Sequence, residues 1–532
     1  MKKAISGSGF VFTAAFLVSV FAATPSAFAT TRYIAQTAGT FSGGSACNGQ
    51  TTITPATFNG TTNAAGDLDY ICGTITVAAN TEALKVNGSG TSASPITLKF
   101  DSGAVLSSPE WPADGTGGAI DVGGNSYIVI DGNGGANGWT QGIIEATANG
   151  DSGAPCLSGS CTDHGDSNGV EGDGATYITV TGLAIIDMYV TTGNPNPGGG
   201  TCVYDVGSAT GWTVSNNLMH DVGWCVEFQY EGTTSNITIS GNTIYNIDHG
   251  IALGGPESGA TLSNVTISGN NIHDYSNWDT SNDEWHHDGV HIWGYNDNGS
   301  DHISGITINN NKFGGCIGQN VTAHVFIEQN AGGDTNVTVY NNSFIDTCSG
   351  NENDGMLAVE DSAAAPLIYN NTFIGASTDT CAGFGDGSPS NITFVNNVVS
   401  GCGIFMYVPS PASFTAGGLH NNIYAACPGS NCFAYHDGDT NAFSSWQSAT
   451  GQDASPSAYV STADLSAAGV PQSGSPVIGA GVNLTSLSIT ALDSDITGAA
   501  RPAVGAWTVG AYTNTGVTPA APTGLTGTIV TN

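Results

Sequence analysis

Apolar and polar residues alternate in short segments that recur through the middle of this chain. A segment such as Ile237-Thr238-Ile239 places apolar side chains on one face and a polar side chain on the other, as a β-strand does. An asparagine and then an apolar pair follow each segment. Eight copies are present: WTVSNNLMHD, ITISGNTIYN, VTISGNNIHD, ITINNNKFGG, VTVYNNSFID, LIYNNTFIG, ITFVNNVVSG and LHNNIYAA. The pattern predicts many short strands built from one repeated unit.

The aligned asparagines of the repeat set its length. They are Asn217, Asn242, Asn270, Asn311, Asn342, Asn371, Asn397 and Asn422, and their successive spacings are 25, 28, 41, 31, 29, 26 and 25. A near-constant minimum with insertions is typical of stacked coils whose turns carry loops of different length. One coil cannot bury its inner face, so neighbouring coils must stack about 4.8 Å apart. We expect the asparagines to hydrogen-bond along the stack as a ladder, at turns whose left-handed backbone asparagine tolerates.

This whole pattern resembles the pectate-lyase-like superfamily of right-handed parallel β-helix proteins, over roughly residues 75–440. The resemblance implies an all-β fold, a single-stranded right-handed parallel β-helix. We expect the solenoid at 30–440, a C-terminal β segment at 441–512 that caps its open end, and a Pro/Thr/Gly-rich tail at 513–532. Further coils are expected around Ile96-Thr97-Leu98, Tyr127-Ile128-Val129-Ile130 and Tyr177-Ile178-Thr179-Val180, with an insertion loop at 134–170.

The N-terminus predicts export. Lys2 and Lys3 precede an apolar stretch, and Ala27-Phe28-Ala29 forms a cleavage motif, so residues 1–29 are expected to be a secretory signal peptide. No other segment is apolar and long enough to cross a bilayer. We therefore expect a secreted, extracellular protein, which we take to be a monomer.

The 12 cysteines all follow the expected cleavage site, and an even number in an exported chain predicts disulfides. Spacing alone does not fix the connectivity. Sequence neighbours suggest the pairs Cys47–Cys72, Cys156–Cys161, Cys202–Cys225, Cys316–Cys348, Cys381–Cys402 and Cys427–Cys432.

The charge balance limits the partners. Seven Lys and Arg stand against 43 Asp and Glu, and removal of Lys2 and Lys3 leaves five basic residues. A surface this acidic repels nucleic acid, which we exclude as a partner, and it also argues against a polyanionic glycan in a basic groove. Bound Ca²⁺ could reverse that effect locally.

Five strands that follow the asparagines predict an exposed wall of the solenoid. They are 225–229, 250–254, 289–293, 324–328 and 356–360, and alternation points their first, third and fifth residues outward. The wall then carries Glu227, Gln229, His291, Trp293, His324, Glu328 and Glu360. Glu328 and Glu360 fall at the same place on adjacent coils, with Trp293 one coil below. An exposed indole beside carboxylates is a usual way to stack a sugar ring and act on its glycosidic bond.

The segment 285–294, WHHDGVHIWG, is the richest in chemistry-bearing side chains and lies in the longest coil. It resembles the His-x-Asp-Gly-apolar-His/Gln motif of some carbohydrate-active β-helix proteins, at His286, Asp288 and His291. The neighbouring coil supplies Asp248 and His249 at nearly matching places. We take Asp288, His291, Glu328 and Glu360 as catalytic candidates, and Trp293, Glu227, Gln229, His324 and His286 as substrate-binding candidates. Asp288-Gly289 could equally be a turn, and Glu328 with Glu360 could be a calcium site rather than catalysts.

Three functions remain open from the sequence. The first is an extracellular glycoside hydrolase that cleaves a neutral or weakly charged polysaccharide with two carboxylates. The second is a calcium-dependent polysaccharide lyase or epimerase with His or Tyr as its base, since no Lys or Arg is placed beside His291. The third is a non-enzymatic glycan-binding protein or surface adhesin. The metal, if any, stays open, with Ca²⁺ as one candidate.

Overall fold

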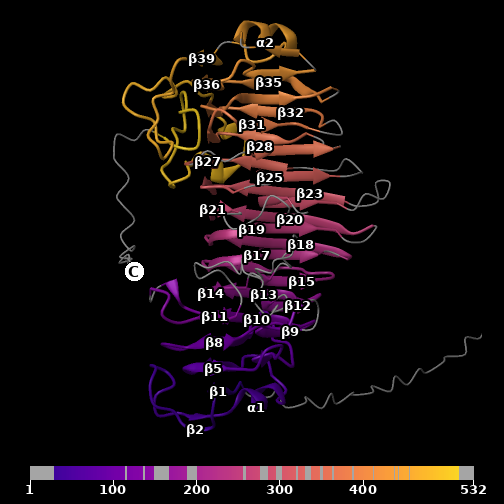
Figure 1. The fold of residues 1–532 in the computed structure, drawn as a ribbon, viewed down its shortest axis with the longest axis vertical. Helices are drawn as coiled ribbons and strands as arrows, with labels where there is room; N and C mark the ends of the chain where they lie inside the picture. The colour runs from indigo at the N-terminus through magenta and orange to yellow at the C-terminus, as the bar shows by residue number, and fades with distance from the viewer. Residues whose placement is uncertain are drawn as a thin grey trace, which may run out of the picture.

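The computed structural model is a right-handed parallel β-helix whose coils stack along one long axis (Figure 1). It describes residues 29–113, 117–135, 138–148, 167–188, 200–229, 231–255, 259–275, 286–294, 302–318, 321–329, 337–347, 352–361, 365–385, 389–410, 412–436, 438–440, 442–454 and 456–513. In these ranges, no helix is long and apolar enough to span a membrane. Residues 1–28 of the expected leader at 1–29, and residues 514–532 of the expected tail at 513–532, lie outside them.

One face of the solenoid is a 13-stranded parallel sheet in which each strand pairs with the equivalent strand of the next coil. Its strands are β1 (Thr31–Ile34), β4 (Leu68–Ile71), β7 (Ile96–Phe100), β10 (Ser126–Asp131), β13 (Thr176–Thr181), β16 (Thr213–Ser215), β18 (Thr233–Ser240), β20 (Thr261–Ser268), β23 (His302–Asn309), β26 (Val337–Tyr340), β29 (Leu367–Tyr369), β32 (Ile392–Val395) and β35 (Phe414–His420). The expected early coils are confirmed as β7, β10 and β13.

The other strands form two further series, which β17 (Leu218–Gln229) and β19 (Thr243–Gly254) join because each runs through both. The first series is β5 (Thr74–Thr76), β8 (Val105–Ser108), β11 (Ile143–Ala146), β14 (Ala184–Ile186), β21 (Asn271–Tyr275), β24 (Lys312–Gly315), β27 (Ser343–Asp346), β30 (Thr372–Ile374), β33 (Val398–Ser400), β36 (Ile423–Ala425) and β39 (Ala458–Val460). The second is β6 (Leu84–Lys85), β9 (Ile120–Gly123), β12 (Asn168–Asp173), β15 (Thr201–Val206), β22 (His287–Trp293), β25 (Val321–Gln329), β28 (Glu352–Asp361), β31 (Thr380–Gly383), β34 (Ile404–Val408), β37 (Phe433–Tyr435) and β38 (Gly438–Thr440). A separate pair is β2 (Gly39–Thr40) with β3 (Thr51–Thr52). The insertion expected at 134–170 therefore contains β11 and the start of β12.

The asparagine ladder is confirmed. In each coil, the amide nitrogen atoms of one ladder residue donate to Oδ1 of the next: Asn270 N and Nδ2 lie 2.9 and 3.0 Å from Asn311 Oδ1. The left-handed backbone belongs to the residue just before the ladder position, such as Asn310 at φ 57° or Gly269 at φ 66°. This explains the Asn-Asn and Gly-Asn pairs of the repeat, because the first residue makes the turn and the second makes the ladder.

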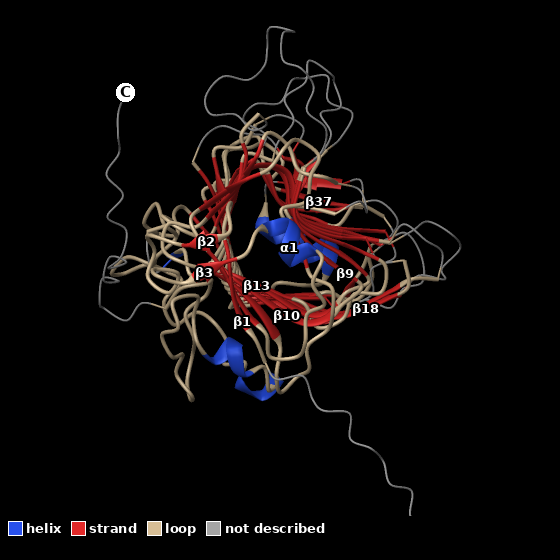
Figure 2. Cartoon of the chain, turned by 90° about the horizontal axis from the view of Figure 1, so that it is seen from below, coloured by secondary structure: helices blue, strands red, loops and turns tan. Residues whose placement is uncertain are grey.

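Short helices and the C-terminal chain cover the solenoid. Helix α1 (Pro55–Asn59) lies across the N-terminal end and buries Phe58 (Figure 2). Helix α2 (Phe443–Thr450) buries Trp446 against Phe433 of the last coils, with ring centroids 4.9 Å apart. The expected capping by the C-terminal segment is wrong for its larger part, because 461–513 packs along the side of the last coils (Figure 1).

That C-terminal segment includes the turns η2 (Thr485–Leu487) and η3 (Thr490–Asp493). Its Trp507 packs on Tyr340 and Tyr369, and Arg501 Nη2 donates to Asn341 Oδ1 at 2.8 Å. Between the segment and the first series of strands lies a cavity of ≈ 340 Å³, lined among others by His273, Lys312 and Tyr512.

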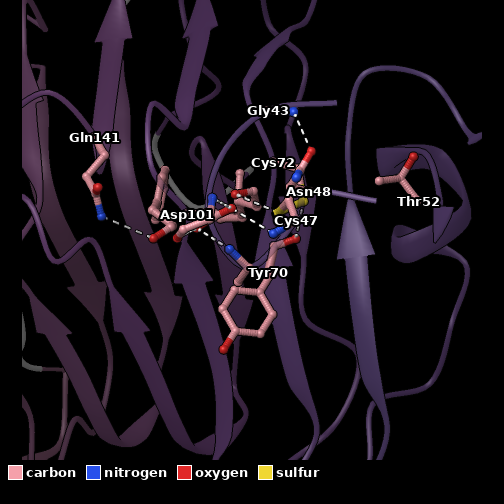
Figure 3. The surroundings of a disulfide bond; sticks show 12 residues. Gly43, Cys47, Asn48, Thr52, Tyr70, Cys72, Asp101 and Gln141 are labelled. Carbon is pink, nitrogen blue, oxygen red and sulfur yellow. Dashed lines mark hydrogen bonds between the residues drawn. A yellow bond between two sulfur atoms is a disulfide. The ribbon is translucent and has the colours of Figure 1, made fainter. Parts of the chain in front are cut away.

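Three predicted disulfides are confirmed: Cys47–Cys72, Cys381–Cys402 and Cys427–Cys432. Figure 3 shows the first of them beside Asp101, which accepts hydrogen bonds from the backbone of the Cys47 loop. Cys316 is also disulfide-bonded, and its predicted partner Cys348 lies outside the described residues, as do Cys156 and Cys161.

The predicted bond between Cys202 and Cys225 is wrong in this structure, because both are buried thiols with sulfur atoms 3.2 Å apart, against about 2.05 Å for a disulfide. Burial raises the pKa of the Cys202 thiol well above its usual value. We expect both thiols to resist alkylation in the folded protein and to react after unfolding, as followed by peptide mapping. A disulfide-linked peptide joining the two residues would contradict this.

A buried carboxyl predicts a pH-dependent stability. Asp205 is 1% exposed, its Oδ2 accepts from Ala175 N at 3.0 Å, and its Oδ1 has no hydrogen-bond partner in the described chain. Burial raises its pKa from 3.8 to about 8, although the Ala175 amide works against the shift. Between about pH 4 and pH 8 the unfolded chain has released this proton and the folded chain has kept it, so stability falls as pH rises.

We expect Asp205→Asn to remove up to about 1.4 kcal/mol per pH unit of that slope, measured as the free energy of unfolding in urea at several pH values. Equal slopes in the variant and the wild type would show that Asp205 does not carry the effect.

Candidate functional site

Parallel register brings the candidate side chains into three outward columns on the second series of strands. The first column is Trp224, His249 and Asp288, and the second is Glu227, Ala252, His291 and Phe326. The third is Gln229, Gly254, Trp293, Glu328 and Glu360. We call these columns the wall. The predicted register of Trp293, Glu328 and Glu360 on adjacent coils is therefore the observed one.

Asp288 and three imidazoles meet at the centre of the wall. Asp288 Oδ2 lies 3.5 Å from His249 Nε2, 3.4 Å from His286 Nε2 and 3.9 Å from His291 Nδ1. His286 Nε2 and His291 Nδ1 are themselves 3.4 Å apart. Of all His, Cys, Asp and Glu in the described ranges, these four form the one group whose ligand atoms all lie within 4.8 Å of one another. We call them the His₃Asp cluster.

The fold holds this cluster from behind. Asp288 is fully buried, and its Oδ1 accepts a 2.9 Å hydrogen bond from the backbone N–H of Ala323 on the next coil. Trp224 stacks on His249 with centroids 4.3 Å apart, and Trp293 and Phe326 stack on His291 at 4.5 and 4.8 Å. The imidazole orientations are therefore set by packing, before any ligand binds.

Electrostatics keeps these imidazoles neutral. Burial lowers the pKa of His249 well below its usual value, and the neighbouring imidazoles of His291 and His286 lower it further. Burial also lowers the pKa of His286 to about 4. It lowers the pKa of His291 too, although the Glu328 carboxylate opposes this. Near pH 7 these imidazoles are consequently unprotonated, and their nitrogen lone pairs are available to bind a metal.

Glu328 extends the cluster toward solvent. Its Oε2 lies 3.3 Å from His291 Nε2, and its side chain is 29% exposed. Trp293 lies beside it in the third column, and the indole packs so closely over Gly254 that a Cβ there would come within 1.8 Å of the ring. Only glycine at 254 therefore permits this position of the indole. Glu360 follows Glu328 on the next coil.

Two substrate-binding candidates lie further along the wall. Glu227 is 6% exposed and accepts hydrogen bonds from Gln229 Nε2 at 2.6 Å and from Thr201 Oγ1 at 3.3 Å. Both residues are on β17, two coils from Asp288.

The predicted exposure is wrong for Glu227 and His291, which are 6% and 5% exposed, and for His324. The His324 side chain is fully buried, and its Nε2 lies 3.0 Å from Asp346 Oδ1, which is also buried. The register shifts between Val321 and Ala323, and again between His287 and Asp288. Both shifts come before His324, which lies in the regular part of the register. His324 and the next residue, Val325, are both fully buried, so two consecutive side chains turn inward and the period-two alternation breaks between them.

His249 is the site residue that sequence reasoning left out of its candidates. The available signal was the shared pattern of His249-Gly250-Ile251 and Asp288-Gly289-Val290, which places His249 and Asp288 side by side on adjacent coils.

Comparison with known proteins gives similarity at the level of the fold. No family model matches the chain, and no curated protein matches it. Among solved structures, a GH136 lacto-N-biosidase from Eubacterium ramulus is 11% identical, with 81% of this chain and 68% of that chain covered and a TM-score of 0.43. The pectate lyase Pel9A is 15% identical over 91% and 96% of the two chains, with a TM-score of 0.40.

An exopolygalacturonase from Thermotoga maritima is 10% identical over 68% and 78%, with a TM-score of 0.34. The assignment of this chain as a right-handed parallel β-helix protein, as the repeat predicts, rests on its own strand order and register. Similarity at these values carries no information on its activity.

Proposed function

We propose that this chain is an exported carbohydrate-active enzyme that hydrolyses glycosidic bonds at the wall. One observation carries the proposal: Glu328 is half-exposed, hydrogen-bonded to His291 and flanked by the indole of Trp293. A carboxylic acid coupled to an imidazole can exchange a proton with a leaving-group oxygen. An indole beside it offers the apolar face on which a sugar ring stacks.

Glycoside hydrolysis needs a second carboxylate, and Glu360 is the one that the register offers. Glu328 and Glu360 are direct partners on adjacent parallel strands, so their backbones are about 4.8 Å apart. A retaining mechanism, in which one residue is the nucleophile and the other is the acid and then the base, needs carboxyl groups about 5–5.5 Å apart. Glu328 Oε2 contacts His291 on the preceding coil and the Glu360 carboxylate lies over Gly385 on the following one, so the two side chains must turn toward each other when substrate binds. Asp288 takes the role of orienting His286 and His291 from behind.

The placement of the basic residues favours a neutral or weakly charged glycan. Arg32, Lys85 and Lys99 form ion pairs with acids in the first coils. Lys312 is on β24, in the first series of strands, and Arg501 is in the C-terminal segment. None of the five basic residues beyond position 29 therefore offers the wall a cationic base or a partner for a uronate, as a Lys- or Arg-dependent lyase requires.

The test is a panel of polysaccharides incubated with the purified protein, with and without chelator, followed by new reducing ends and by the ultraviolet absorbance of unsaturated uronates. We expect reducing ends without that absorbance. Both signals together would replace the hydrolase by a lyase. If no polysaccharide of the panel is cleaved while the protein still binds glycans in an array, the protein is a glycan-binding protein and the enzyme proposal is refuted.

A further inference from the structure

We propose that His249, His286, Asp288 and His291 bind one divalent transition-metal ion of the zinc class. The inference goes beyond the proposed function and rests on the donor geometry alone, so it holds or fails whatever the glycan chemistry proves to be.

The separations between the donor atoms are those of ligands that share a small ion. Zn²⁺ bonds of about 2.0–2.1 Å in a tetrahedron place ligand atoms about 3.3–3.4 Å apart. Here Asp288 Oδ2 lies 3.5 Å from His249 Nε2 and 3.4 Å from His286 Nε2, which is itself 3.4 Å from His291 Nδ1. The separation of Asp288 Oδ2 from His291 Nδ1, 3.9 Å, needs a closing movement of a few tenths of an ångström.

The separations between the four donor atoms are longer than direct hydrogen bonds between these side chains would make them. Most protein hydrogen bonds to nitrogen span about 2.7–3.2 Å, and the four separations given above are all longer. Among them only His286 Nε2 to His291 Nδ1, at 3.4 Å, is a long hydrogen bond, as the 3.3 Å contact of His291 with Glu328 is. His249 is 1% exposed, yet neither of its ring nitrogens has a hydrogen-bond partner in the described chain. A buried imidazole that points a nitrogen at a carboxylate oxygen without bonding to it leaves room for an ion between the two.

The surroundings of the donors are those of an organised metal site. His291 turns Nδ1 toward the cluster and its other nitrogen, Nε2, toward the Glu328 carboxylate at 3.3 Å, which is the carboxylate–histidine–metal arrangement. Asp288 uses Oδ1 for the Ala323 N–H and turns Oδ2 to the imidazoles. Three donors are buried, whereas the His286 side chain is 42% exposed and leaves a path for an ion.

The donor set selects the metal. Three imidazole nitrogens and one carboxylate oxygen suit Zn²⁺ and Co²⁺, whereas Ca²⁺ takes six to eight oxygen ligands. Ca²⁺, which the acidic composition suggests as a candidate, is therefore expected not to bind at this cluster.

The experiment is a titration of chelator-stripped protein without a polyhistidine tag. Co²⁺ is followed by its visible absorption, Zn²⁺ by competition with Co²⁺, and Ca²⁺ by calorimetry. We expect one Co²⁺ per chain, displaced by one Zn²⁺, and no Ca²⁺ at the site. Glu328→Gln should weaken binding about 10–100-fold through the loss of its hold on His291. Loss of a ligand in His286→Ala or Asp288→Asn should weaken it more than that.

If Asp288→Asn fails to fold, His286→Ala still tests the metal site, because the His286 side chain is half-exposed and its removal opens no cavity in the core. His302→Ala, at an exposed histidine of β23, is the matched control and should bind as the wild type does. Absence of one-to-one Co²⁺ binding, or equal affinity in His286→Ala and wild type, would overturn the inference. If the protein binds Co²⁺ and Zn²⁺ but cleaves no glycan, only the proposed function is refuted. If it cleaves a glycan but binds neither ion in the titration, only the metal site is refuted.

Discussion

Glu328→Gln is expected to lower kcat for glycan cleavage by about 10²–10⁴-fold, the usual contribution of one general acid or base. Glutamine keeps the size of the side chain and can still contact His291, but it cannot hold or release the proton. The measurement is the initial rate of reducing-end release, made with saturating Zn²⁺ so that loss of metal does not enter the comparison.

Glu231→Gln is the control for the same chemical change at an exposed carboxylate just past the end of β17, three coils from Glu328, and it should leave the rate unchanged. If Glu328→Gln cleaved as fast as the wild type while unfolding at the same temperature, Glu328 would not be the acid or base.

Asn311→Ala is expected to lower the free energy of unfolding by about 2–4 kcal/mol. Asn311 is fully buried, its Oδ1 accepts from Asn270 N at 2.9 Å, and its Nδ2 donates to Ile267 O at 2.9 Å. Alanine leaves this N–H and this carbonyl in the interior without those partners, and each such group costs about 1–3 kcal/mol. Denaturant unfolding followed by circular dichroism measures the change.

Each coil of a solenoid contacts only its neighbours, so an interrupted ladder should also broaden the unfolding transition. Thr266→Ala, an outward residue of β20, removes a hydroxyl of the same coil outside the ladder and should shift stability by less than about 0.5 kcal/mol. Equal stability of Asn311→Ala and the wild type would mean that the ladder is dispensable.

The fold could be predicted from the sequence because its cause is local and repeated. In each coil, a segment equivalent to Ile237-Thr238-Ile239 predicts a strand, and a ladder asparagine predicts the turn that follows it. The C-terminal segment has no such repeat. Its place beside the coils depends on single contacts such as Arg501 with Asn341, which no spacing reveals.

The site could be predicted only where strand alternation is regular. His291, Trp293 and Glu328 point outward because Val290 and Ile292 point inward between them. At His324 that rule fails, because His324 and Val325 are consecutive and both lie inside the solenoid. The sequence places His249 on the coil next to Asp288 but does not make it a candidate, because its role depends on direct contact with Asp288, a residue 39 positions later.

The most direct test of the wall as a sugar-binding active site is a crystal structure of Glu328→Gln with an oligosaccharide of the glycan that the wild type cleaves. The account predicts a sugar ring stacked on Trp293, with a glycosidic oxygen within about 2.6–3.2 Å of the residue 328 side chain. An oligosaccharide bound elsewhere, for example in the cavity lined by His273, Lys312 and Tyr512, with the wall empty, would contradict it.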